Sequence, residues 1–255
     1  MQTRMKLSVA IITLNEEVNI GRTLDSVINV ADEIVVVDNG STDRTLEIAR
    51  SYGDKIRIIH EPWRGFAGQK NFAMEQCTGD WILSLDADEE VSPELGATIR
   101  ETAENATVDA IVVNRKLMFL GRWIHRAGLY PDPKVRLVRR GKAWFEDRPV
   151  HESIHFEGPT LQARGDLIHW AYHNLDDFME HQNRYSSIGA TLVKPKKARH
   201  VFLYGVIAPL LRFKYDYFFR LGFLDGFEGL LWHIYHAVYS SLKYAKAWDA
   251  HRKRG

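Results

Sequence analysis

The run Trp81-Ile82-Leu83-Ser84-Leu85-Asp86-Ala87-Asp88-Glu89-Glu90 decides the fold of this 255-residue chain. An apolar stretch with strand character ends there in two carboxylates separated by one residue. In an open α/β sheet, ligands bind just outside the carboxyl ends of the strands, so Asp86 and Asp88 are expected to face a crevice. Hard divalent cations prefer oxygen ligands such as these. An isolated Asp-x-Asp more often caps a helix or lies in solvent, so its neighbours decide the interpretation.

Two earlier strand candidates also end in polar residues. The apolar run 34–37 leads directly to Asp38, and the run 7–12 leads to the polar turn 13–17. Because the carboxyl ends of neighbouring parallel strands meet at one edge of a sheet, three polar strand ends favour a shared ligand site over three unrelated turns.

Strand and helix patterns alternate through the first part of the chain, which predicts an α/β fold with a mostly parallel central sheet and flanking helices. Ser92 and Pro93 are expected to begin one of these helices. The predicted strands cover residues 7–12, 33–37, 56–59, 81–85 and 109–116, and the predicted helices cover residues 19–30, 43–51, 68–76 and 92–102.

The later part of the chain differs in composition. Residues 119–172 are rich in Gly, Pro, His, Trp and Arg, as is typical of loops that form a site. The chain then becomes helical and ends in an aromatic-rich tail. We therefore expect a catalytic domain over 1–175, with a donor half (about 5–118) and an acceptor half (about 119–175), followed by a helical C-terminal extension over 176–255.

Charge and hydropathy limit the possible partners. The formal net charge of +1 gives no general attraction to nucleic acid, and none is expected as a partner. The single cysteine, Cys77, excludes an intramolecular disulfide framework and fits a reducing compartment. No signal peptide is recognised, and the longest apolar run, 201–211, is about half of the ~20 residues that a bilayer span requires.

The tail nevertheless has features of a membrane-surface segment. Apolar residues at helical spacing define one face, and basic residues lie before and after it. That face either packs on the catalytic domain or binds an anionic membrane surface, so the expected location is cytoplasmic and peripheral on the inner face of the cytoplasmic membrane. The apolar residues are Phe227, Leu231, Ile234, Val238 and Leu242, and the basic residues are Lys194, Lys196, Lys197, Arg199, Arg252, Lys253 and Arg254.

Four short motifs occur in the order and spacing of family 2 glycosyltransferases, which this chain resembles. They are Thr13-Leu14-Asn15-Glu16, Val37-Asp38-Asn39-Gly40-Ser41-Thr42-Asp43, Gly68-Gln69-Lys70-Asn71 and Leu85-Asp86-Ala87-Asp88. The resemblance covers residues 7–90 and, more weakly, 110–175. It implies the nucleotide-sugar-binding (GT-A) fold, a UDP-linked sugar donor, and inversion at the anomeric carbon.

The same resemblance implies roles for individual residues. A divalent cation, Mg²⁺ or Mn²⁺, is expected on Asp88 and Asp86. Independently of the resemblance, the place of His169 between an apolar strand and an aromatic residue suggests that it reaches the same metal and diphosphate. Lys70 stands where many members have Arg, which keeps the charge but not the planar bidentate contacts. The implied donor-binding residues are Thr13, Asn15, Glu16, Asp38, Lys70, Asn71 and Asp86.

Later motifs resemble the branch of the family that contains lipopolysaccharide-core β-glucosyltransferases. That resemblance implies a cell-envelope glycan or lipid-linked acceptor, such as lipopolysaccharide core. The motifs are Gly128-Leu129-Tyr130-Pro131-Asp132, Lys134-Val135-Arg136-Leu137-Val138-Arg139-Arg140, Val150-His151-Glu152 and His169-Trp170-Ala171-Tyr172.

An inverting transfer needs a carboxylate that removes the proton of the attacking acceptor hydroxyl. Glu152 is the first candidate for this base, with His151 beside it to tune it or hold the acceptor, and Asp132 is the second. The expected function is thus metal-dependent, inverting hexosyl transfer from a nucleotide sugar.

Other functions share parts of this pattern. A dinucleotide-binding dehydrogenase is excluded because the turn after the first strand lacks Gly-x-Gly-x-x-Gly. A haloacid-dehalogenase-like phosphohydrolase would use Asp86 as its nucleophile, but it would usually carry this motif on its first strand. A non-catalytic sugar-nucleotide-binding protein remains an alternative if the middle region holds no base.

Overall fold

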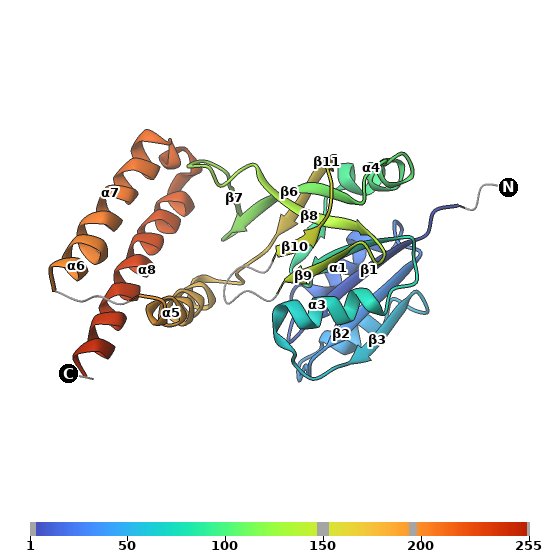
Figure 1. Ribbon diagram of the computed structural model, residues 1–255, viewed down its shortest axis with the longest axis horizontal. Coiled ribbons are helices and arrows are strands. Elements are labelled where there is room, and N and C mark those ends of the chain that lie inside the picture. The colour runs from blue at the N-terminus through green and yellow to red at the C-terminus, as the bar shows by residue number, and fades with distance from the viewer. Residues whose placement is uncertain (1–3, 147–152, 194–197, 254–255) are drawn as a thin grey trace. The chain divides into compact units, whose positions relative to one another are not determined.

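The computed structural model of the protein describes residues 4–146, 153–193 and 198–253, and the chain forms two compact units (Figure 1). The first unit contains Met1–Lys116 and Asp132–Trp170, and the second contains Leu117–Pro131 and Ala171–Gly255. Compared with the expected division near residue 175, the segment 117–131 joins the C-terminal helices. The reason lies in the apolar side chains of this segment, which pack among those helices.

The first unit is built on one sheet with the strand order β3-β2-β1-β4-β8-β6-β11-β5. The pairs β3–β2, β2–β1 and β1–β4 are parallel, whereas β4–β8, β8–β6 and β11–β5 are antiparallel. The predicted α/β fold class is confirmed, with a sheet that is mixed because parallel pairing ends at β4. The strands are β1 (Leu7–Thr13), β2 (Glu33–Asp38), β3 (Ile56–His60), β4 (Trp81–Asp86), β5 (Glu89–Val91), β6 (Ala110–Phe119), β8 (Asp132–Arg139) and β11 (Thr160–His169).

Helices cover both faces of the parallel strands, so these strands are apolar on both sides. On β1, Leu7, Val9 and Ile11 belong to one buried cluster with α1, α2 and α4. Ala10 belongs to a second cluster with α3. The helices are α1 (Ile20–Val27), α2 (Thr45–Arg50), α3 (Gly65–Glu75) and α4 (Pro93–Glu104). A separate two-stranded antiparallel sheet is formed by β9 (Ala143–Glu146) and β10 (Ser153–Phe156).

The helix starts follow from capping chemistry. Ser92 caps α4 as predicted: its Oγ accepts a hydrogen bond from the N–H of Leu95 (3.3 Å), and Pro93 occupies the first turn. At the start of α2, Asp43 Oδ1 accepts a hydrogen bond from the N–H of Thr45 (3.0 Å).

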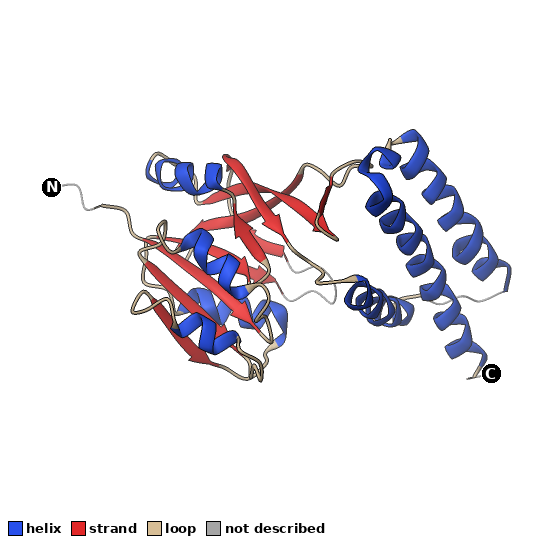
Figure 2. Ribbon diagram, turned by 180° about the vertical axis from the view of Figure 1, so that it is seen from behind, coloured by secondary structure: helices blue, strands red, loops and turns tan. Residues whose placement is uncertain are grey.

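The second unit consists of a β-hairpin and a group of helices, and Figure 2 draws all helices in blue and all strands in red. The end of β6 pairs with β7 to form the hairpin. The elements are β7 (Arg122–Ile124), α5 (Leu175–Thr191), α6 (Ala198–Phe202), the π-helical turn η1 (Leu203–Ile207), α7 (Ala208–Lys214), the π-helical turn η2 (Tyr215–Phe219), the 3₁₀ turn η3 (Gly222–Asp225) and α8 (Gly226–Arg252).

The core of the second unit explains why the hairpin belongs to it. Phe119 and Ile124 of the hairpin pack with Phe178 of α5 and Trp232 of α8, and the rings of Phe178 and Trp232 stack with their centroids 5.7 Å apart. Asp225 is fully buried and accepts hydrogen bonds from the N–H groups of residues 125 and 126 (3.1 and 2.9 Å). The hairpin is therefore fixed by both apolar packing and backbone hydrogen bonds.

Candidate active site at the carboxyl edge of the sheet

The predicted convergence of three strand ends is present. In the strand register Thr13 of β1 is opposite Asp38 of β2, and Ile12 of β1 is opposite Asp86 of β4. The polar residues that end β1, β2 and β4 thus lie side by side at one edge of the sheet. This edge is where ligands bind in open α/β sheets.

Asp38 lies at the base of this edge and is fully buried. Its carboxylate accepts hydrogen bonds from the N–H groups of Gly40 (3.0 Å) and Ser41 (3.1 Å), and His60 Nδ1 lies 3.1 Å from it. Gly40 has a φ of 110°, which suits a residue without a side chain at this tight turn. The neighbouring Thr13 hydroxyl is buried and has no hydrogen-bond partner among the described residues. The pair combines a fixed acceptor with a hydroxyl that can bind a ligand.

The loops after β1 and β2 are joined by reciprocal hydrogen bonds. The N–H of Asn15 donates to Ser41 Oγ (2.9 Å), the N–H of Thr42 donates to Asn15 Oδ1 (2.8 Å), and the N–H of Glu16 donates to Thr45 Oγ1 (2.7 Å). Asn15 has a φ of 55°, a left-handed conformation that asparagine tolerates better than most residues. Asn15 therefore shapes the rim of the site through its own backbone and side chain.

Asp86 is held between two cations. Its Oδ1 lies 2.7 Å from Lys70 Nζ, and its Oδ2 lies 3.1 Å from an Arg136 guanidinium nitrogen. Burial favours the neutral acid, but the two cations outweigh it and hold the pKa of Asp86 well below its ordinary value. Asp86 is thus an anion at any physiological pH.

Beneath Asp86 lies a second carboxylate, Glu89, which is fully buried. Glu89 Oε1 lies 2.6 Å from Arg136 Nη2, and its Oε2 accepts a hydrogen bond from the N–H of Asp86 (3.0 Å). Burial disfavours the guanidinium, but Glu89 and Asp86 outweigh it and raise the pKa of Arg136. Sequence reasoning assigned no role to Glu89 or Arg136, although both lie inside quoted motifs.

Three backbone groups of the Asp-x-Asp turn have hydrogen-bond partners. Besides the bond from Asp86 to Glu89, the Thr23 hydroxyl donates to the carbonyl of Ala87 (2.6 Å), and the N–H of Trp170 donates to the carbonyl of Asp88 (2.9 Å). The Trp170 indole also donates to Glu90 Oε2 (2.8 Å). The turn that carries Asp86 and Asp88 is therefore fixed by α1, β5 and the end of β11.

Asp88 faces His169 across this turn. Asp88 Oδ2 lies 3.2 Å from His169 Nε2. Burial favours the neutral form of both groups, but their mutual attraction outweighs it, lowering the pKa of Asp88 and raising the pKa of His169. Asp88 Oδ1 and His169 Nδ1 are buried and have no hydrogen-bond partner among the described residues. A buried carboxylate oxygen without a partner is an unusual feature that a cation would satisfy.

The donor set fits a cation that is completed by its substrate. Within residues 4–146, 153–193 and 198–253, no group of three or more His, Cys, Asp or Glu side chains is arranged to hold a metal. Asp88 and His169 therefore supply two ligands at most. That number suits Mg²⁺ or a similar ion, which takes one or two carboxylates and fills its other positions with phosphate oxygens and water.

Three other expected site residues, Asn71, Glu16 and Asp132, have hydrogen-bond or ion-pair partners within the protein. Asn71 exchanges two hydrogen bonds with the backbone of Phe145 (2.7 and 2.9 Å), and so joins α3 to β9. Glu16 accepts a hydrogen bond from the Asn19 amide (2.9 Å). Asp132 lies 2.9 Å from Arg115 and 2.8 Å from Lys134.

The first candidates for the base, His151 and Glu152, lie outside the described residues. The structure therefore leaves their assignment as a prediction from sequence.

Parallel strands β1, β2 and β4 with an Asp-x-Asp turn at their shared edge define a nucleotide-sugar-binding, GT-A-type fold. The model of the family described as Glycosyl transferase family 2 matches residues 8–150, more than half of the chain, and the chain belongs to this family. The predicted glycosyltransferase class is confirmed, and the phosphohydrolase alternative is not favoured.

Relatives match nearly the whole length of the chain. It is 36% identical to the lipopolysaccharide core biosynthesis glycosyltransferase LpsC of Rhizobium meliloti, over 98% of this chain and 95% of that one. It is 34% identical to an uncharacterized glycosyltransferase of Rickettsia typhi, over 94% and 86% of the two chains. The match to LpsC confirms the predicted resemblance to lipopolysaccharide-core enzymes.

A solved structure shares the fold. The mannosyltransferase PcManGT from Pyrobaculum calidifontis, in complex with GDP-Man and Mn²⁺, aligns with a TM-score of 0.56 over 97% of this chain and 88% of that one, at 16% identity.

Proposed function

We propose that this family 2 glycosyltransferase transfers a hexose, with inversion, from a UDP-linked sugar to a lipopolysaccharide-core or other lipid-linked acceptor. The observation that carries the donor part of the proposal is the alignment of Thr13, Asp38 and Asp86 at one edge of the sheet. The acceptor part is supported by the 36% identity to LpsC over nearly the full length of both chains.

In this proposal the base and ribose bind against the edge formed by β1 and β2. Asp38 is held rigidly by backbone N–H groups and accepts a hydrogen bond from the base. The Thr13 hydroxyl supplies a second polar contact, with Asn15 and Glu16 forming the rim beside it. Lys70 and Asp86, paired at 2.7 Å, lie toward the ribose and diphosphate. Asn71 contributes by holding β9 next to them.

Asp88 and His169 would hold the divalent cation, since they combine a buried carboxylate oxygen without a partner with an imidazole. When bound, such a cation neutralises charge on the diphosphate leaving group. Asp86 contributes its charge at the same place but keeps Lys70 and Arg136 as partners.

Glu152 is proposed as the general base, with His151 beside it. The surroundings of Asp132 support this order, because both of its carboxylate oxygens already face cations, Arg115 and Lys134. With both oxygens of Asp132 facing cations, an acceptor hydroxyl would have to displace one of these contacts to reach the carboxylate.

The site of action that we propose with this function is the cytoplasmic face of the cytoplasmic membrane, where a nucleotide-sugar donor and a lipid-linked acceptor can meet. Purified protein should be tested against a panel of nucleotide sugars with Mg²⁺ or Mn²⁺ by nucleotide release. Release from UDP-hexoses that stops with chelator is the expected result. Tight nucleotide-sugar binding without any release would instead indicate a non-catalytic binding protein.

A further inference from the structure

The helical unit carries a large apolar surface on the stretch from Phe202 to Phe227. More than half of the large apolar side chains that are exposed in the described part of the chain lie in this stretch. Phe219 is 78% exposed and Leu211 is 61% exposed. Contiguous apolar surface of this kind marks an interaction site, because soluble monomers rarely expose it.

The arrangement of α6, η1, α7 and η2 explains this exposure. These elements run beside α8, and their buried residues are Gly205, Pro209 and Asp216. At Gly205 the approach is so close that a Cβ atom would lie 3.0 Å from Tyr244 Cβ. Because the inner face is made of small residues, the large apolar side chains point outward. A surface helix of a soluble protein usually has the opposite arrangement.

The charges on this surface have one sign. Asp216 and Asp225 are buried and paired within the unit, Asp216 with Arg212 and Arg220 and Asp225 with His125. The exposed charged side chains between residues 198 and 227 are all cationic, namely Arg199, Arg212 and Lys214. Docking this surface on a second copy of itself would bring like charges together, whereas an anionic surface complements them.

We propose that the apolar surface of residues 202–227 docks this protein on an anionic lipid bilayer, with its large side chains in the interface and its cations at the headgroups. Within the described ranges no helix combines the length and apolar character needed to cross a bilayer, so the contact lies in the plane of the membrane. This inference agrees with a lipid-linked acceptor but does not rest on the donor chemistry proposed above.

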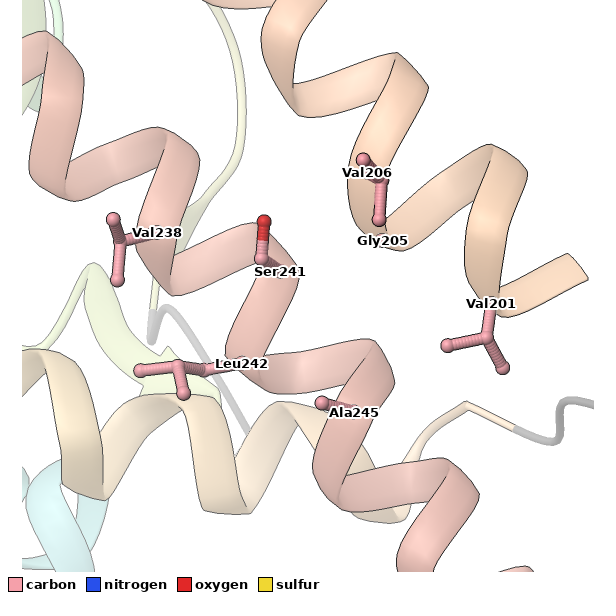
Figure 3. A pocket seen from close by; sticks show the side chains of 7 residues that line it. All are labelled: Val201, Gly205, Val206, Val238, Ser241, Leu242 and Ala245. Carbon is pink, nitrogen blue, oxygen red and sulfur yellow. The ribbon is translucent and has the colours of Figure 1, made fainter. Parts of the chain in front are cut away.

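A groove next to this surface is lined mainly by apolar side chains. Figure 3 shows the groove between two segments: α6 and η1, which carry Val201 and Val206, and α8, which carries Val238 and Leu242. The volume of the groove is about 270 Å³. The one hydroxyl in its lining, Ser241 Oγ, donates to the carbonyl of Ala237 in its own helix (3.1 Å). The groove thus offers apolar contacts, which suit an acyl chain from the bilayer.

Cys77 makes a direct test possible. It is buried, and burial raises the pKa of its thiol to about 12, so it resists alkylation. A Phe219→Cys variant can therefore be labelled selectively with an environment-sensitive fluorophore. A matched Leu161→Cys variant places the label on an exposed position of the first unit.

Vesicles of phosphatidylcholine with phosphatidylglycerol should shift the emission of the label at position 219 to the blue, and should leave the label at position 161 unchanged. Vesicles of phosphatidylcholine alone should give a weaker shift. Equal responses at both positions, or no response at position 219, would overturn the proposal.

Substitutions test the same surface without a label. Leu211→Ser with Phe219→Ser should reduce binding to the anionic vesicles by roughly tenfold or more, whereas Trp63→Ser with Leu161→Ser in the first unit should not. Lys214→Glu should weaken binding mainly at low salt. If vesicle binding is unaffected and the Leu211/Phe219 variant instead abolishes a concentration-dependent dimer, the occupant is a second copy and the bilayer proposal fails.

Transfer to a water-soluble, delipidated acceptor separates this proposal from the proposed function. The Leu211/Phe219 variant should keep that activity at the wild-type level while losing vesicle binding. If intact protein binds vesicles but transfers no sugar to any acceptor, the proposed function fails and the docking surface stands.

Discussion

Glu89 Oε1 and Arg136 Nη2 lie 2.6 Å apart beneath the Asp-x-Asp turn, and both side chains are buried. The same guanidinium nitrogen lies 3.1 Å from Asp86 Oδ2. Arg136 therefore connects the buried carboxylate of Glu89 to that of Asp86, which lies at the carboxyl edge of the sheet. This relationship makes Glu89 a positioning residue for the site.

Glu89→Ala should destabilise the protein by about 3–5 kcal/mol, because it leaves the buried Arg136 with one carboxylate partner and the N–H of Asp86 with none. Chemical denaturation measures this change. Glu94→Ala, which changes an exposed glutamate in the first turn of α4, is the control and should stay within about 1 kcal/mol of wild type. Equal effects of the two substitutions would show that the pair contributes little.

Asp86→Asn and Asp88→Asn should differ in their effects on stability. Asp86→Asn removes the charge that balances Lys70 and Arg136, so the melting temperature should fall. Asp88→Asn removes the partner of His169, but the imidazole can lose its proton in response, so the melting temperature should fall less than in Asp86→Asn while Mn²⁺ binding in the presence of UDP is lost. Calorimetry and Mn²⁺ titration measure the two properties. Unchanged Mn²⁺ affinity in Asp88→Asn would contradict the metal assignment.

Metal affinity should increase with pH. Asp88 raises the pKa of His169 although burial opposes it, so a proton on the ring stabilises the metal-free fold below the ordinary histidine pKa of ~6.5. That stabilisation is lost as the pH rises through the raised pKa. Because a cation needs the ring nitrogen deprotonated, affinity should rise up to the raised pKa and then level off. His169→Gln should flatten the titration of apparent Mn²⁺ affinity against pH.

Asp38→Asn should raise the KM for the donor more than it lowers kcat. A contact with the base is present in both ground and transition states, so its loss weakens binding without a matching loss in the chemical step. Steady-state kinetics with varied donor measure both constants. Circular dichroism should show an intact fold, since the amide oxygen still accepts a hydrogen bond at this turn. A lowered kcat with an unchanged donor KM would contradict the assignment.

Glu152→Gln should reduce kcat by roughly 10²–10⁴ and leave donor binding nearly unchanged, because it removes basicity and keeps the size of the side chain. Asp132→Asn should have a smaller effect on kcat and should destabilise the fold, since it removes the nearest carboxylate of both Arg115 and Lys134. An active Glu152→Gln variant together with an inactive Asp132→Asn variant would move the base to Asp132.

The parallel half of the sheet could be predicted because local patterns determine it. Each of its strands is an apolar run that ends in a polar turn, and adjacent parallel strands bring those turns together without knowledge of distant pairings. Arg136 could not be assigned in this way. It reaches Asp86 because β8 pairs antiparallel with β4, a contact between strands 50 residues apart in the chain at these two positions.

The helical unit was less predictable for a similar reason. Apolar residues at helical spacing indicated a helix but not which of them are covered. The apolar residues predicted to form one face of α8 do not share one environment. Leu231 packs on the core, whereas Phe227 is exposed. The composition of the segment 117–131 resembles that of site-forming loops and therefore predicted a place in the acceptor half. In the structure its Phe119 and Ile124 pack with α5 and α8.

The hydrogen bonds between the loop of Asn15 and Glu16 and the loop of Ser41, Thr42 and Thr45 have a consequence for protein engineering. Side-chain oxygens of each loop accept hydrogen bonds from backbone N–H groups of the other loop. Neither loop can therefore change length alone without leaving backbone N–H groups unpaired. Grafting donor specificity from another enzyme should therefore succeed when both loops are exchanged as a unit and fail when one is exchanged. The two loops must therefore change together, although Asn15 and Ser41 are 26 positions apart in the chain.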